Sequence, residues 1–313
     1  MTAISDIKIP KEDRTNRAAA IDWRPQYAIM GVIALVAAVD LAWLWATPME
    51  LDWAAAADIF LIPCLLSIIC IVYLRFRPEP RIAATTLILA ELFAFAVPGV
   101  TLSYLTTSLG QPMIDDTLAR WDAMMGFDWL GYTRYVEAHP GLYTLQGLLY
   151  ISSRYQIGFL IALFGFTGRS AQATHLVATL IISAIVTSVI GGLFPALGGY
   201  DNFGLPAPEG SDFADAITAF HSGQMHLINF KEVKGIITFP SYHTAISVAL
   251  ILASWPYRYI RYPMLTLNVA LFASIPVIGA HYLSDMIAGA AIVFIVDQAL
   301  RLISRHNQTS LAN

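Results

Sequence analysis

Two histidines in the second half of the chain have neighbours suited to phosphate chemistry. The first, His243, ends the run Pro240-Ser241-Tyr242-His243 at the start of an apolar segment. Proline loses no hydrogen bond in the first turn of a helix, and the free N–H groups there attract an anion. Ser241 and Tyr242 are candidate phosphate ligands, and His243 can exchange a proton near neutral pH. A capped helix with an incidental histidine would show the same pattern.

The second histidine, His281, is followed four residues later by Asp285 at the start of the last apolar segment. Residues four apart share one face of a helix, and a carboxylate bound to one imidazole nitrogen raises the basicity of the other. His281 is therefore a candidate nucleophile. The other interpretations are a local hydrogen-bonded pair or a metal site. One histidine and one carboxylate are too few to fill a metal shell, so we expect no metal and no cofactor.

The composition places these residues in a membrane protein. Of 313 residues, 57% are hydrophobic and 13% are charged, about half the charged fraction of a soluble domain. A soluble enzyme is excluded on this ground. The net charge of −4 at pH 7 gives no basic excess that would attract nucleic acid. The two cysteines, six residues apart in one apolar run, match neither a disulfide framework nor a zinc site.

Apolar runs of helix-spanning length predict an all-α, polytopic membrane helix bundle with about eight transmembrane helices. The runs cover residues 26–46, 55–75, 82–108, 142–166, 174–194, 240–256, 262–280 and 284–303, the sixth being a little short. We expect a cytoplasmic tail at residues 1–25, without a signal peptide, followed by three N-terminal transmembrane helices at 26–108. An outside interfacial segment follows at 109–141. The membrane core at 142–303 includes an outside loop at 195–239, and a cytoplasmic C-terminal tail at 304–313 ends the chain.

The distribution of Lys and Arg predicts that both termini are cytoplasmic. With eight spans, thirteen of the 18 Lys and Arg residues fall on the side of the termini and four on the other, as the positive-inside rule requires. The sixth and eighth spans then both run inward from the non-cytoplasmic side. His243 and His281 are therefore expected at the same membrane face, toward the periplasm, the extracellular space or an organelle lumen.

The two motifs together resemble the type-2 phosphatidic acid phosphatase superfamily. Its patterns are Pro-Ser-x-His and Ser-Arg-x5-His-x3-Asp, which correspond here to residues 240–243 and to His281 with Asp285. Residues 235–245 (GIITFPSYHTA) and 279–282 (GAHY) are more narrowly similar to its inositolphosphorylceramide-synthase-like branch. The resemblance implies a six-helix phosphatase-like core. The match itself covers residues 142–303, the last five of the eight expected spans, and leaves the first three spans outside.

The resemblance implies a metal-independent lipid phosphate phosphatase or phosphotransferase. By analogy with the family, His281 attacks phosphorus to form a phosphohistidine, Asp285 orients it, and His243 protonates the departing alkoxide and then activates the acceptor. Water as acceptor gives a phosphatase, and a lipid or polyol hydroxyl gives an inositol-phosphate-type headgroup transferase. The motifs do not separate these outcomes. The expected partners are a lipid-phosphate substrate and the bilayer, with the oligomeric state left open.

The chain departs from the family pattern in the cationic residues that bind phosphate. The pattern Lys-x6-Arg-Pro is absent upstream of the first motif, and Ile275 stands where an arginine is expected six positions before His281. Lys231 and Lys234, shortly before the first motif, are candidates, with solvated loop charges as the alternative.

Arg154 is a third candidate cation because it lies about halfway along the fourth span. An ionisable residue at that depth normally faces a cavity or a partner, and a guanidinium can bind phosphate through two hydrogen bonds. The alternative is a structural ion pair with Glu91, which also lies within a span.

A secondary transporter is the rival from another class of protein. Asp40, Asp58, Glu91 and Arg154 lie within spans, and charges in such positions often mark ion paths. Transporters of this kind usually show paired interrupted helices in corresponding halves. The sequence shows no such pair, and we therefore prefer the enzyme.

Overall fold

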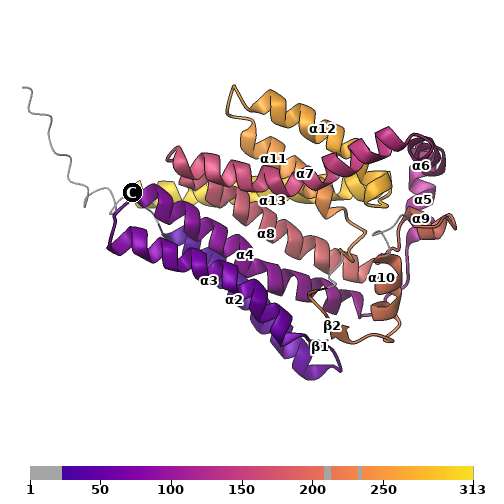
Figure 1. Ribbon diagram of the computed structural model, residues 1–313, viewed down its shortest axis with the longest axis horizontal. Coiled ribbons are helices and arrows are strands. Elements are labelled where there is room, and N and C mark those ends of the chain that lie inside the picture. The colour runs from indigo at the N-terminus through magenta and orange to yellow at the C-terminus, as the bar shows by residue number, and fades with distance from the viewer. Residues whose placement is uncertain (1–22, 208–212, 232–234, 313) are drawn as a thin grey trace, which may run out of the picture.

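The computed structural model describes residues 23–207, 213–231 and 235–312, and it is a bundle of long helices (Figure 1). Within the described ranges, seven helices are long and apolar enough to cross a membrane. They are α2 (Arg24–Ala46), α3 (Trp53–Arg75), α4 (Pro80–Thr107), α7 (Pro140–Phe166), α8 (Ser170–Leu193), α12 (Arg261–Ile278) and α13 (Leu283–Ala312). The prediction of an all-α, multi-pass membrane protein is confirmed.

The expected sixth span is a shorter helix, α11 (Tyr242–Ser254), of 13 residues. At 1.5 Å per residue it spans about 20 Å, less than the roughly 30 Å of hydrocarbon in a bilayer. One of its ends must therefore lie within the thickness that its neighbours cross. Helix α11 packs against α7, α8, α12 and α13, and buried backbone groups at a helix end can find partners in such neighbours.

Short elements gather at one end of the bundle, opposite the start of α2 and the end of α13 (Figure 1). They are α5 (Asp115–Met124), α6 (Trp129–Glu137), α9 (Gly199–Asn202), α10 (Phe213–His221) and the two-residue strands β1 (Glu50–Leu51) and β2 (Leu227–Ile228). The strands pair in parallel, with Glu50 opposite Leu227. Helices α5 and α6 lie within residues 109–141, the expected interfacial segment.

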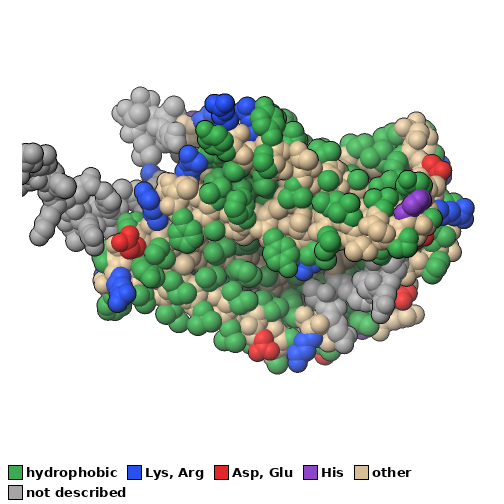
Figure 2. Space-filling view, turned by 45° about the horizontal axis from the view of Figure 1, so that its top comes forward, with side chains coloured by type: hydrophobic (Ala, Val, Ile, Leu, Met, Phe, Trp, Pro, Cys, Tyr) green, Lys and Arg blue, Asp and Glu red, His purple; other side chains and the backbone are tan. Residues whose placement is uncertain are grey.

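The largest apolar core lies around α8, which contacts α4, α7, α11 and α13. Side chains from α2, α4, α7, α8, α11, α12 and α13 contribute to this core, so two of the three N-terminal helices, α2 and α4, share it with the rest of the bundle. Outer helices such as α2 and α3 expose most of their apolar side chains. Figure 2 shows a broad hydrophobic surface on the visible face, which a bilayer can cover.

The last helix is longer than predicted. Helix α13 continues to Ala312, so residues 304–312, expected as part of a tail, extend the helix that begins in the bundle. The physical reason is visible in the sequence, because residues 301–312 contain neither Gly nor Pro to break the helix.

Helix α13 lies close to the start of α11 at Gly289, where an added Cβ would overlap the carbonyl oxygen of Ser241. The Gly289→Ala substitution should push these helices apart and destabilise the protein by about 1–3 kcal/mol, as overpacking generally does. Thermal unfolding in detergent measures the effect. The control is Gly158→Ala in α7, where an added Cβ meets no atom within 4 Å. Equal melting temperatures for the two variants would contradict the predicted close packing.

Candidate active site

The rings of His243 and His281 lie near each other, with centroids 6.5 Å apart and planes inclined by 56°. His243 is the second residue of α11. His281 lies in the connection between α12 and α13, which we call the His281 loop (residues 279–282). The side chain of His281 is buried, and that of His243 is partly exposed. At this separation both rings can reach one tetrahedral group placed between them.

Asp285 lies beside His281, but the two residues do not share one face of a helix as their spacing predicts. Nδ1 of His281 is 3.4 Å from Oδ2 of Asp285, although His281 precedes the first turn of α13 instead of lying on it. The contact forms because the Asp285 carboxylate turns back over the loop and accepts a hydrogen bond of 2.8 Å from the Tyr282 amide. Among the described residues, Nδ1 of His281 has no hydrogen-bond partner, so Asp285 lies beside the ring without a hydrogen bond to it.

Burial lowers the pKa of His281 to about 4, because the charged ring would lose its hydration, and a hydrogen bond to the backbone of Thr238 partly opposes this shift. The imidazole is therefore neutral at pH 7. A neutral ring has a nitrogen lone pair available for attack on an electrophile.

Tyr150 of α7 holds the other histidine. Its hydroxyl oxygen lies 2.8 Å from Nδ1 of His243, and the two rings stack with centroids 4.1 Å apart and planes inclined by 27°. When the hydroxyl donates to Nδ1, the proton of neutral His243 resides on Nε2, where it can be given to another group. The sequence analysis missed Tyr150. Its signal is the spacing of four residues before Arg154, which places both on one face of α7.

Arg154 is the predicted cation that lies near Tyr150 and His243, and it is exposed. Its charge acts on both Tyr150 and His243. The alternative, an ion pair with Glu91, is not formed, because within the described part of the chain neither carboxylate oxygen of Glu91 has a hydrogen-bond partner. Arg154 therefore lies near the candidate site rather than in a structural pair.

The other predicted phosphate ligands are placed less directly. The Tyr242 hydroxyl donates a 3.0 Å hydrogen bond to the carbonyl of Leu180 in α8. Its proton is therefore used in the contact between α11 and α8 and not offered to a phosphate. The side chain of Lys231 is exposed, and its backbone N–H donates to the Asn229 side chain. Lys234 lies outside the described residues.

Ser241 forms the cap of α11. Its hydroxyl oxygen accepts hydrogen bonds from the amide and the hydroxyl of Thr244, at 3.3 and 3.1 Å, and its own amide donates to the carbonyl of Asp285 at 3.0 Å. Among the described residues, the amides of Tyr242 and His243 have no hydrogen-bond acceptor. These two N–H groups remain available for an anion at the helix N-terminus.

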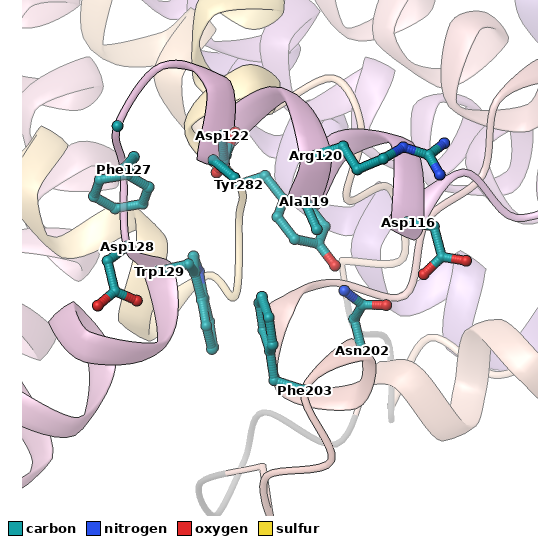
Figure 3. A pocket seen from close by; sticks show the side chains of 12 residues that line it. Asp116, Ala119, Arg120, Asp122, Phe127, Asp128, Trp129, Asn202, Phe203 and Tyr282 are labelled. Carbon is teal, nitrogen blue, oxygen red and sulfur yellow. The ribbon is translucent and has the colours of Figure 1, made fainter.

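A cavity of about 660 Å³ lies beside the His281 loop. It is formed by α5, α6 and α9 together with Tyr282, and Figure 3 shows Trp129 and Phe203 side by side in its wall. Their rings stack with centroids 5.5 Å apart. Its charged lining residues are Asp116, Arg120, Asp122 and Asp128.

Comparison with known protein families matches residues 116–297, more than half of the chain, to the PAP2 superfamily. The chain belongs to the PAP2 superfamily. The matched region contains both histidines, Asp285 and Arg154, and the resemblance that the motifs indicated is confirmed at this level. No curated protein and no solved structure matches the chain. Membership of the PAP2 superfamily supports a phosphatase-type function.

The described residues contain no group of three or more His, Cys, Asp or Glu side chains placed to hold a metal ion. In this PAP2 protein Arg154 and the amides that begin α11 lie near His243 and could balance phosphate charge.

The Tyr150→Phe substitution tests the contact with His243. It keeps the stacked ring but removes one hydrogen bond, so the rate of phosphate release should fall about 3- to 10-fold. The assay is phosphate release from a lipid phosphate by the purified protein. The control is Tyr155→Phe, because Tyr155 is 73% exposed on the same helix and should be neutral. Equal rates for both variants would show that Tyr150 does not orient His243.

Proposed function

We propose that this protein is an integral-membrane enzyme that cleaves or transfers the phosphoryl group of a lipid-linked phosphate through a phosphohistidine on His281. One observation carries the proposal: His243 and His281, whose ring centroids are 6.5 Å apart, meet in a multi-pass bundle that belongs to the PAP2 superfamily. Two imidazoles at this distance can act as nucleophile and proton donor on one phosphate.

In the first half-reaction, a ring nitrogen of neutral His281 attacks phosphorus. The N–P bond forms while the P–O bond to the leaving alkoxide breaks, and His243 gives a proton to that oxygen. Asp285, 3.4 Å from Nδ1, stabilises the positive charge that the new bond leaves on the ring. In the second half-reaction, His243 takes a proton from water or an acceptor hydroxyl as the oxygen attacks phosphorus. His281 is then released.

The charge of the transferring phosphate is balanced by groups around His243. Arg154 can donate two parallel hydrogen bonds to phosphate oxygens. The amides of Tyr242 and His243 add donors at the positive end of α11, and Ser241, which accepts from Thr244, can contribute its own hydroxyl proton. Donors placed in advance around the transferring phosphate stabilise the transition state more than the ground state.

We place this site at the non-cytoplasmic face, with both termini cytoplasmic. The proposal is supported by the excess of Lys and Arg on the side of the termini, and by the position of α5 and α6 at the other end of the bundle (Figure 1). A substrate with a lipid tail can keep the tail in the bilayer while its phosphate reaches the histidines.

The second candidate function is transfer of a phosphorylated headgroup, of the inositol-phosphate type, to a lipid acceptor. The cavity of about 660 Å³ beside Tyr282 supports this second candidate function, because the cavity has room for a second, hydroxyl-bearing substrate. A screen of acceptors with a radiolabelled phosphoryl donor separates the two functions. Labelled inorganic phosphate indicates hydrolysis, and a labelled acceptor indicates transfer.

The His281→Ala substitution should abolish phosphate release from phosphatidic acid or an isoprenyl diphosphate, assayed in EDTA. His243→Ala should lose multiple turnover, while a substrate with a good leaving group still labels His281, because such a group needs no proton. The control is His139→Ala, which changes an exposed histidine and should retain activity. Substrate uptake that survives His281→Ala, without phosphate release, would reject the enzyme in favour of a transporter.

The Arg154→Gln substitution should lower kcat/KM by about 10- to 100-fold, the loss expected when a charge-assisted hydrogen bond to phosphate is removed. Arg134→Gln is the matched control because Arg134 is exposed on α6, and it should change kcat/KM less than twofold. If Arg154→Gln behaves like the control, the phosphate charge is balanced elsewhere, and Lys231 and Lys234 become the residues to substitute.

A further inference from the structure

We infer that Asp122 and Trp129 are positioning residues that hold the His281 loop in the conformation needed for attack on phosphorus. The inference rests on the proposed function, because it takes His281 as the nucleophile. It assigns a mechanistic role to α5 and α6, which come from the segment that the sequence analysis treated as interfacial. Both side chains lie along the cavity beside Tyr282 (Figure 3).

Trp129 binds the backbone of the nucleophile itself. Its indole Nε1–H donates a 3.0 Å hydrogen bond to the carbonyl oxygen of His281. The indole is 2% exposed and packs against the rings of Tyr200 and Phe203, with centroid distances of 5.2 and 5.5 Å. Because these rings prevent the indole from swinging, the hydrogen-bond donor stays at one place and holds the His281 carbonyl there.

Asp122 binds the residues that follow. Its two carboxylate oxygens accept hydrogen bonds from the amides of Leu283 and Ser284, at 2.7 and 2.9 Å. These amides begin α13 and have no acceptor within their own helix. A carboxylate is the favoured partner at this positive end, and here it comes from a residue 161 positions earlier in the chain. Asp122 therefore fixes where α13 begins, between His281 and Asp285.

Further contacts hold the other side of the loop. The amide of Gly199 donates to the carbonyl of Ala280 at 2.9 Å. Asp115 accepts from the amides of Leu197 and Gly198, and also from the hydroxyl of Tyr282 at 3.2 Å. Every residue from 280 to 284 thus has a hydrogen bond to α5, α6 or residues 197–199.

The backbone at Ala280 shows why this support is needed. Its φ is +55°, a left-handed conformation that residues other than Gly, Asn and Asp seldom adopt. Such a conformation persists where the surrounding structure imposes it. The buried side chain of His281 has few polar contacts, with Asp285 at 3.4 Å and the backbone of Thr238. The position of the ring therefore depends on the position of the backbone that carries it.

The Trp129→Phe substitution is the first test, made in the purified full-length protein. It keeps a packed aromatic ring but removes the Nε1–H donor. A radiolabelled lipid phosphate and a single turnover report the rate at which His281 becomes phosphorylated. This rate should fall about 10- to 100-fold, because small misplacements of a nucleophile have effects of this size. The KM should stay within about twofold. Trp121→Phe, at a residue 46% exposed on α5, is the control and should label His281 at the wild-type rate.

The second test compares two carboxylates that both cap helices. Asp122 binds the amides that begin α13, whereas Asp128 binds the Gly131 amide at the start of α6, at 2.9 Å. The Asp122→Asn substitution places an amide NH₂ against one of two N–H donors, so labelling of His281 should slow as with Trp129→Phe. Asp128→Asn should leave it unchanged. If Asp122→Asn does not fold, Trp129→Phe alone decides.

The outcomes separate this inference from the proposed function. If the wild-type protein shows no labelling of His281, the proposed function fails. If the wild-type protein is labelled and Trp129→Phe is labelled at the same rate, the positioning inference is overturned even where the melting temperature falls. Equal losses in kcat and stability for Asp122→Asn and Asp128→Asn would also overturn it, because both would then act only on folding.

Discussion

The candidate site depends on the contact between the start of α11 and the start of α13. The Ser241 amide donates to the Asp285 carbonyl at 3.0 Å, and the absence of a side chain at Gly289 lets the two backbones approach. This contact brings together two motifs that are distant in the sequence. His243 and His281 face one another because the first residues of α11 lie against the first turn of α13. In a bilayer the backbone groups freed at helix ends need partners within the protein. The bond from Ser241 to Asp285 joins the two starts, and Asp122 accepts from the first amides of α13.

The two histidines are held in different ways, which suits the different roles proposed for them. His243 lies in the first turn of a helix, and its ring stacks on Tyr150 and contacts the Tyr150 hydroxyl. A proton donor of this kind needs a defined tautomer. His281 lies on a loop whose conformation is imposed by short helices from another part of the chain. A nucleophile must approach phosphorus along a defined line, and control of the backbone provides it.

The three N-terminal helices lie outside the family match, which begins at residue 116, yet they are not a separate unit. Helix α4 contacts α8 along much of its length, and Ile88, Phe95 and Leu102 belong to the same buried cluster as residues of α8 and α11. Two carboxylates in this part of the chain, Asp40 and Glu91, are buried without hydrogen-bond partners among the described residues. Helices α2 and α4 thus enlarge the core against which α8 and α11 pack.

From residue types and spacings alone, the sequence determined the helical membrane bundle, the pairing of His243 with His281 and the candidate role of Arg154. Apolar length and motif spacing are local properties. Counting the apolar runs gives an even number of membrane crossings between the two histidine motifs, which predicts that both lie at the same membrane face. Only the tertiary structure decided that Tyr150 contacts His243, that Tyr242 turns to α8, and that Asp122 and Trp129 hold the His281 loop. The reason is physical: a hydrogen bond between residues 93 or 152 positions apart leaves no periodic pattern in the chain. It exists only once the helices that carry its donor and its acceptor have packed together.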